Sequence, residues 1–255
     1  MANHFRSARR RIARADTHIK NVETGISVFM AQNPFQVTTE RGTSQGRSDW
    51  IWIKLKQTAP FPDDIGDAAA EAADALRSAL DHACFAVATV AGAENPKSTH
   101  FPFADDPTQL ENVIKRKCRD LPHDFVDLLR DYKPYAGGND LLWAFNKVRA
   151  GNQHRFLLDV AISANHTRLR GKAPHGDFVF GHAPPNWNPE KQEMLLAEGF
   201  GFDPDIDVSV DVQTAFRGAG PLTGKYVVPM LRELHSTVSE IVDDIETYAA
   251  AYRNN

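Results

Sequence analysis

The stretch "DDIGDAAAEAADALRSALDHACFAVATVA" (residues 63–91) has apolar residues every three or four positions, the spacing of one face of an α-helix. Asp63, Asp64 and Asp67 favour a helix N-terminus here, because carboxylates interact well with the positive end of the helix dipole. Gly92 can end the helix. The many alanines predict a closely packed neighbouring helix. The predicted buried stripe is Ile65, Ala69, Ala73, Leu76, Leu80, Ala83 and Val87.

Both ends of the chain predict long helices with a heptad-like apolar seam. The N-terminal seam is Phe5, Ala8, Ile12, Ala15, Ile19, Val22, Ile26 and Phe29. The C-terminal seam is Val227, Leu231, Leu234, Val238, Ile241, Ile245, Tyr248 and Tyr252. Each helix would extend for about 40 Å. It must bury its seam to be stable in water.

The charges of these two helices suggest how they pair. "FRSARRRIAR" near the start is basic, and "SEIVDDIE" near the end is acidic, so we expect antiparallel packing. A homodimer through one of the seams is the alternative. The basic stretch itself is typical of a solvated helix face, although a nucleic-acid-binding arm or a transit peptide would share its composition.

The remaining segments predict a small antiparallel β-sheet. Residues 35–57 read as a β-hairpin, with β-branched and aromatic residues on both sides of a polar, glycine-containing loop. Residues 206–216, "IDVSVDVQTAF", alternate apolar and polar positions, which indicates a strand with one dry face. In the hairpin, one face carries Trp50, Trp52, Lys54 and Lys56. Such a face either grips single-stranded nucleic acid or is covered by another element.

Together these patterns predict one α+β domain over residues 1–255: a helical bundle with long N- and C-terminal helices plus a small antiparallel β-sheet. The bundle would comprise residues 1–34, 63–155 and 223–253, beside the hairpin 35–57 and a β-rich segment 156–221.

Composition and charge exclude several classes of protein. The net charge of −4 argues against a polyanion binder over the whole surface. No apolar run approaches the roughly 18 residues that a membrane span needs, and no signal-peptide pattern is present. Two cysteines, Cys84 and Cys118, do not make a disulfide framework. We therefore expect a cytoplasmic protein with no membrane partner.

Two polar segments share an Arg-x4-His spacing, and the first is "RSALDH" at residues 77–82. On a helix Arg77 and Asp81 face each other, and His82 lies about 100° further round. This pattern fits either a structural row of ion pairs or a binding site.

The second segment is "RAGNQHR" at residues 149–155. If a helix ends at Gly151, the chain can fold back and bring His154 close to Arg149. Histidine moves protons near neutral pH and arginine stabilises an anion, so the pair could be catalytic. Alternatively, both side chains interact with the carbonyls of a helix C-terminus.

The candidate site residues follow from these two segments and one further histidine. The catalytic candidates are Arg149, His154 and Asn152, and the binding candidates are Arg77, Asp81, His82, Asn146, Arg155 and His100. A metal site at His82, His100, His154 and Asp81 is an alternative, but no HExxH or His-x3-His pair supports it. No phosphate-loop or dinucleotide-binding fingerprint appears either. We therefore predict neither a metal nor a cofactor.

The Arg-x4-His spacing resembles the motif of HEPN domains, helical bundles that often act as metal-independent ribonucleases. The resemblance implies that Arg149 and His154 are an RNA-cleaving pair. A longer region is similar to a family of uncharacterised bacterial proteins with an LR-x-ALDH segment followed by a PY…LW…HR segment. Here these read "LRSALDHA" and "PYAGGNDLLWAFNKVRAGNQHR". That similarity implies a bacterial cytoplasmic origin and one shared site or core, but no reaction.

Two functional hypotheses result. The first is an RNA-directed protein, a HEPN-like nuclease in which His154 transfers protons and Arg149 stabilises the charge of the phosphorane. The second is a non-enzymatic binding or scaffolding protein whose polar clusters are structural.

Overall fold

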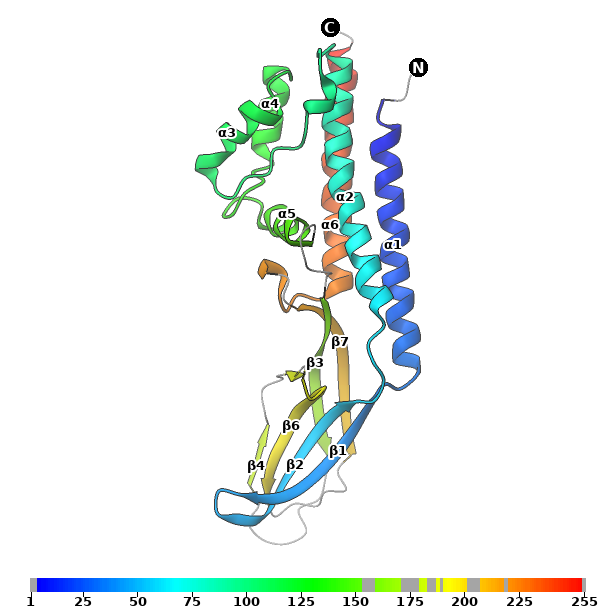
Figure 1. Ribbon diagram of the computed structural model, residues 1–255, viewed down its shortest axis with the longest axis vertical. Helices are drawn as coiled ribbons and strands as arrows, with labels where there is room; N and C mark the ends of the chain where they lie inside the picture. The colour runs from blue at the N-terminus through cyan, green and yellow to red at the C-terminus, as the bar shows by residue number, and fades with distance from the viewer. Residues whose placement is uncertain are drawn as a thin grey trace. The chain divides into compact units, whose positions relative to one another are not determined.

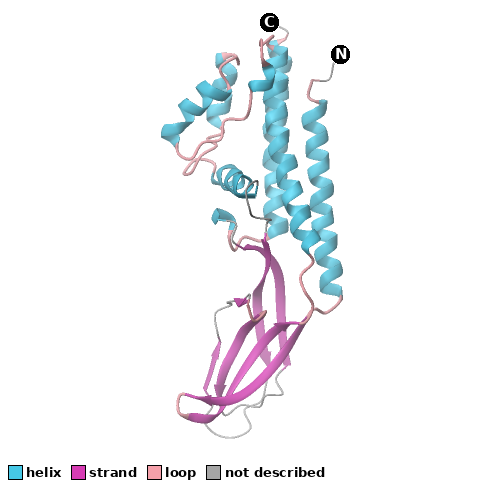
Figure 2. Ribbon diagram, in the orientation of Figure 1, coloured by secondary structure: helices cyan, strands magenta, loops and turns pink. Residues whose placement is uncertain are grey.

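The computed structural model describes residues 4–152, 159–170, 179–182, 187–188, 190–200, 207–217 and 220–253. The fold is α+β, as predicted, with long helices and an antiparallel sheet (Figure 2). The chain forms two compact units. The helical unit comprises Met1–Thr24, Asp64–Asp159 and Phe216–Asn255, and the sheet unit comprises Gly25–Asp63 and Val160–Ala215.

Three long helices dominate the first of these units: α1 (Arg6–Ala31), α2 (Asp63–Val90) and α6 (Val227–Tyr252) (Figure 1). The bounds of α2 lie within one residue of the predicted ones, and all seven residues of its predicted stripe are buried. Its small side chains allow the close approach that the alanines predicted. Among the described residues, no helix is both long and apolar enough to cross a membrane.

Helices α1 and α6 pack antiparallel, as their charges predict. Arg9 near the start of α1 pairs with Asp243 and Glu246 near the end of α6. Arg232 near the start of α6 binds Asp16 at 2.6 Å and Glu23 at 2.8 Å. Most of both seams is buried; Ile12, Ile26 and Tyr248 are half-buried and Tyr252 is exposed. Exposed ion pairs contribute little, so the apolar seams supply most of the stability.

Three shorter helices complete this unit: α3 (Pro107–Lys117), α4 (His123–Asp131) and α5 (Asp140–Asn152). Asp106 caps α3 by accepting hydrogen bonds from two backbone amides of its first turn. Asn139 plays the same part for α5, where its side chain accepts from Leu142 N at 3.1 Å. Helix α5 continues through Gly151 and ends at Asn152. The cysteines Cys84 and Cys118 are free and buried.

The main sheet has the order β1-β2-β6-β4, and β5 also pairs with β6. The predicted hairpin is β1 (Phe35–Ser44) and β2 (Arg47–Gln57), and it joins this sheet because β2 pairs antiparallel with β6. The other strands of the main sheet are β4 (Val179–His182), β5 (Trp187–Asn188) and β6 (Glu193–Phe200). A separate two-stranded sheet contains β3 (Asp159–Arg170) and β7 (Asp207–Arg217).

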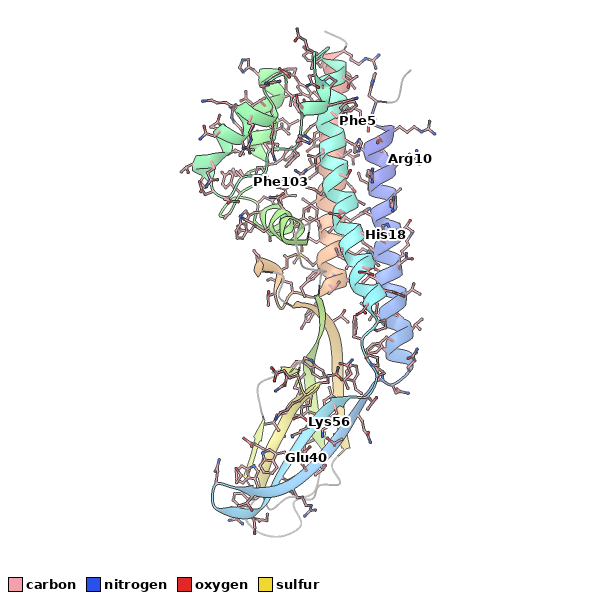
Figure 3. The ribbon with its side chains drawn as sticks, viewed as in Figure 1. Phe5, Arg10, His18, Glu40, Lys56 and Phe103 are labelled. Carbon is pink, nitrogen blue, oxygen red and sulfur yellow. The ribbon has the colours of Figure 1, made fainter. Side chains whose placement is uncertain are left out.

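The two faces of the main sheet differ in character. One face forms an apolar cluster of Ile51, Ile53, Leu55, Met194, Leu196 and Ala197, with Phe35, Val37 and Trp187 packed against it. On the other face the two predicted lysines, Lys54 and Lys56, both bind Glu40 of β1 (Figure 3 marks Glu40 and Lys56). The alternation of the hairpin thus places its side chains as the sequence predicts.

Candidate functional site

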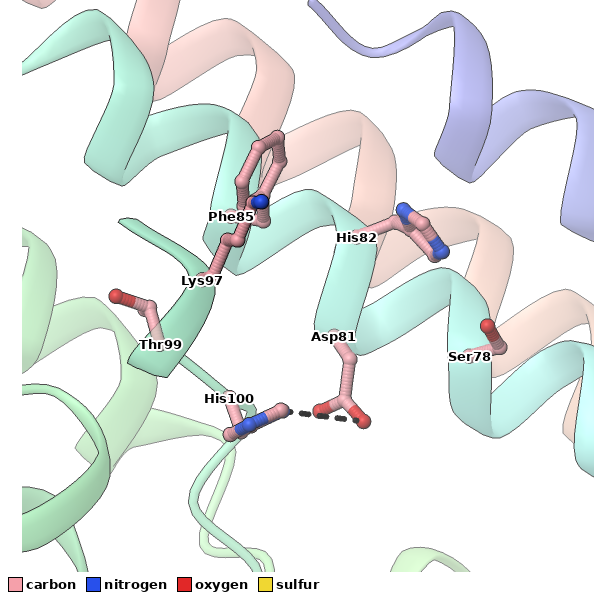
Figure 4. A pocket seen from close by; sticks show the side chains of 7 residues that line it. All are labelled: Ser78, Asp81, His82, Phe85, Lys97, Thr99 and His100. Atoms are coloured by element: carbon pink, nitrogen blue, oxygen red, sulfur yellow. Dashed lines mark ion pairs between the residues drawn. The ribbon is translucent and has the colours of Figure 1, made fainter. Parts of the chain in front are cut away.

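A cavity of about 370 Å³ lies beside α2 in the helical unit, and we call it the α2 cavity. Its lining comes from one stripe of α2, from the short 3-10 helix at Pro96–Ser98 and from the two residues that follow this helix (Figure 4). The four α2 side chains stand at positions i, i+3, i+4 and i+7, so the 3.6-residue period places them on one face. The lining residues are Ser78, Asp81, His82, Phe85, Lys97, Thr99 and His100.

Asp81 connects the two walls of the α2 cavity. Its Oδ1 atom accepts a hydrogen bond from Arg77 Nη1 at 2.5 Å and another from the backbone amide of Phe101 at 2.9 Å. Its Oδ2 atom lies 3.7 Å from His100 Nδ1, which is an ion-pair distance when the imidazole is protonated, but too long for a hydrogen bond. One carboxylate oxygen therefore holds the structure together, and the other faces a titratable group.

Arg77 supports this arrangement from the buried side. Arg77 is only 5% exposed, and its guanidinium carbon lies 4.4 Å from the ring centroid of Phe103. Within the described residues its Nε atom has no hydrogen-bond partner. A buried guanidinium needs a counter-charge, so Asp81 and Arg77 stabilise each other as a pair.

The segment that carries His100 is fixed to helix α3. The His100 backbone amide donates to Lys117 O at 3.2 Å, and its carbonyl accepts from Cys118 Sγ at 3.4 Å. Thr99 is buried, whereas the side chain of His100 is 48% exposed. The backbone is thus held while the imidazole remains accessible from the cavity and from solvent.

His82 differs from His100 in its surroundings. Burial lowers the pKa of His82 below the ordinary value of 6.5, and the positive charge of Arg11 lowers it further, whereas Asp81 opposes the shift. His82 is therefore mostly neutral at pH 7 and can accept a proton. The α2 cavity thus combines a neutral imidazole, a second imidazole facing a carboxylate, and the exposed amine of Lys97.

Four of the predicted binding residues meet at this place. Asp81, His82 and His100 line the α2 cavity, and Arg77 holds Asp81 from behind. Asn146 lies on α5 and does not line the cavity.

The predicted catalytic group lies largely outside the described residues. The backbones of Arg149 and Asn152 belong to the last turns of α5, but their side chains are not described. His154 and Arg155 fall wholly outside the described ranges. The distance from His154 to Arg149 or to His82 therefore stays a prediction.

Several lining residues were missed by the sequence reasoning. Ser78 and Phe85 share the helical stripe of His82, so the period could have identified them. Lys97 and Thr99 come from an irregular segment after Pro96, and no local pattern indicates that it packs beside α2. In the described part of the chain, no group of three or more His, Cys, Asp or Glu residues could hold a metal ion.

The aromatic and lysine face of the sheet unit is charge-balanced. Lys54 lies 2.6 Å from Glu40 and 3.1 Å from Glu193, and Lys56 lies 2.8 Å from Glu40. The indole nitrogens of Trp50 and Trp52 both donate to Glu198. The lysine amines and indole nitrogens that would bind a nucleic acid are thus already paired with carboxylates, so the α2 cavity is the stronger candidate site.

Comparison with known proteins adds no family. No protein-family model matches the sequence, and neither a curated protein nor a solved structure gives a match.

Proposed function

We propose that this protein is an RNA-directed, metal-independent nuclease whose site is the α2 cavity. The observation that carries the proposal is that His82, His100 and Lys97 line one cavity, beside an aspartate that is paired with Arg77. Two imidazoles in different environments can divide the roles of general base and general acid.

The chemistry is the transfer of a phosphodiester to a neighbouring hydroxyl. Neutral His82 accepts the proton of an RNA 2′-hydroxyl, whose oxygen bonds to the adjacent phosphorus. The bond from phosphorus to the 5′-oxygen breaks, and the protonated imidazole of His100 gives its proton to that oxygen. The carboxylate of Asp81 stabilises the imidazolium before the transfer, and Lys97 stabilises the negative charge of the phosphorane. The products are a 2′,3′-cyclic phosphate and a free 5′-hydroxyl.

A cleavage assay tests this proposal. The full chain is incubated with a short labelled single-stranded RNA in the presence of EDTA, and the ends of the products are identified. We expect cleavage to cyclic phosphate ends, with a loss of about 100-fold or more in His82→Ala and His100→Ala. His123→Ala is the matched control, because His123 is an exposed histidine on α4, away from the cavity lining.

The outcomes separate the candidate sites. Cleavage that survives both cavity substitutions contradicts the role of His82 and His100. Loss of cleavage in His154→Ala and Arg149→Ala alone would instead assign the reaction to the second Arg-x4-His segment, with Asn152, Asn146 and Arg155 as its neighbours. If the full chain does not cleave RNA, the nuclease proposal fails.

One observation favours the second hypothesis, a non-enzymatic binding or scaffolding protein. Arg77, Asp81 and the Phe101 amide tie α2 to the following segment, as a purely structural cluster would. In that case Arg77→Ala lowers the melting temperature strongly, and His100→Ala changes neither stability nor RNA binding.

A homodimer through a terminal helix also stays a prediction, and the mass measured by light scattering tests it.

A further inference from the structure

The edge of α1 that lies beside α2 carries basic side chains that the proposed reaction does not use. His18 Nδ1 of α1 lies 2.9 Å from Glu71 of α2, which fixes the register of these two antiparallel helices (Figure 1; His18 is labelled in Figure 3). Arg11 lies two turns before His18, and Ser78 lies two turns after Glu71. Each step covers about 10 Å, so Arg11 lies level with Ser78 at the rim of the α2 cavity.

The direction of the Arg11 side chain brings its charge towards His82. Side chains on a helix lean towards the N-terminus of that helix. Because α1 and α2 are antiparallel, the N-terminal direction of α1 is the direction from Ser78 to His82 along α2. The electrostatic effect of Arg11 on the pKa of His82 agrees with this placement. Arg11 is half-buried, and within the described residues it makes no ion pair or hydrogen bond.

Arg14 continues the same edge in the direction of His18. It is exposed, and its Nε atom donates to His18 Nε2 at 3.2 Å. Its remaining guanidinium N–H groups can still bind an anion. Arg10 is exposed on the outer side of the helix, about 100° from Arg11.

The acidic groups along this edge limit its length. Glu71 is the partner of His18, and exposed Asp74 lies one turn before Ser78. The basic groups that remain between Arg14 and the cavity are Arg11 and, in the cavity lining, Lys97 and the two imidazoles. A row of basic groups that ends in a cavity is suited to a flexible polyanion, whose phosphates can follow the row.

We propose that Arg11 and Arg14 form a phosphate-binding track which guides single-stranded RNA along the α1–α2 edge into the α2 cavity. This inference rests on the proposed function, because it names the substrate form that the same site takes. A single strand fits better than a duplex, since its backbone can bend from the edge of α1 into a cavity of about 370 Å³.

The test compares long and short ligands. Binding of a labelled 2′-O-methyl oligouridylate, which cannot undergo the proposed transfer, is measured for the full chain by fluorescence anisotropy over a range of salt concentrations. The 2′-O-methyl form of the dinucleotide uridylyl-uridine is used as a competitor. In the Arg11→Gln/Arg14→Gln variant we expect roughly tenfold weaker binding of the oligouridylate at low salt, with unchanged competition by the dinucleotide. The slope of log K against log salt should fall by about 0.7 for each arginine removed.

The matched control is Arg6→Gln, which removes an exposed arginine about 140° round the same helix from Arg11. It should bind the oligouridylate like the unchanged protein. His100→Ala, by contrast, should weaken binding of both ligands, because it alters the cavity itself.

The two proposals fail in different ways. If the double arginine variant keeps its affinity and its salt slope while His100→Ala binds weakly, the track is wrong and the cavity stands. If Arg6→Gln weakens binding as much as the double variant, the basic helix acts as a diffuse charge, and the track is again wrong. If the unchanged protein binds neither ligand, the proposed function itself is wrong.

Discussion

At the scale of single residues, Asp81 connects the two walls of the α2 cavity. Its two oxygens have different partners: Oδ1 binds Arg77 and the Phe101 amide, and Oδ2 faces His100. Arg77 is buried and carries a permanent charge, so removal of its counter-ion Asp81 would lower the stability of the folded state. The same carboxylate therefore supports both the local fold and the orientation of the candidate acid.

We expect Asp81→Ala to destabilise the protein by about 2–3 kcal/mol, because it leaves a buried guanidinium and a backbone amide without partners. Urea denaturation followed by circular dichroism measures the loss. Asp127→Ala is the control, since Asp127 also pairs with an arginine but its side chain is 69% exposed. A loss no larger than that of the control would contradict a structural role for Asp81.

His82 makes the stability of the protein depend on pH. Burial first, and then the charge of Arg11, lower its pKa below 6.5, so the folded state binds the proton less readily than the unfolded state does. The contribution of neutral His82 to the free energy of unfolding is complete above pH 6.5. It decreases as the pH falls from 6.5 towards the pKa of His82 in the folded state.

An NMR titration of the imidazole resonances should therefore give His82 a pKa below 6.5, and Arg11→Gln should raise it. The free energy of unfolding of His82→Gln should depend less on pH in the same window. A His82 pKa that does not change in Arg11→Gln, with Arg6→Gln as control, would place the arginine away from the cavity.

At the scale of secondary structure, periodicity predicted most of the elements. The helix over 63–91 and the hairpin over 35–57 were found because their apolar spacing is local and regular. The pairing of Ile53 with Ala197 could not be found in this way, because it depends on which distant strands meet. The same holds for the site: Arg77 and Asp81 are one turn apart on a helix, whereas His100 reaches them only through tertiary packing.

The sheet carries its own pH dependence through Glu40. Hydrogen bonds from Lys54 and then Lys56 lower the pKa of Glu40 from 4.5 to about 2. The stability that this carboxylate contributes is complete above pH 4.5 and is lost as the pH falls through the range down to about 2. We expect Glu40→Gln to reduce the steepness of acid unfolding in that range, measured by circular dichroism. An unchanged acid transition would show that these ion pairs do not persist in solution.

At the scale of the whole molecule, the basic groups of the candidate site belong to one of the two units. The chain has a net charge of −4, yet the cavity residues and the α1 arginines that surround the candidate site all belong to the helical unit. On the lysine face of the sheet unit, Lys54 and Lys56 are balanced by Glu40 and Glu193. The overall acidity of the sequence, which argues against a general polyanion binder, is thus compatible with one local basic site.

The most direct measurement is a crystal structure of the full chain bound to a 2′-O-methyl oligoribonucleotide, which cannot undergo the proposed transfer. We expect a phosphate group in the α2 cavity within hydrogen-bonding distance of His82, His100 and Lys97, with the preceding phosphates beside Arg11 and Arg14. A nucleotide bound elsewhere, with the α2 cavity holding only water, would contradict the assignment of this cavity as the site of RNA binding and cleavage.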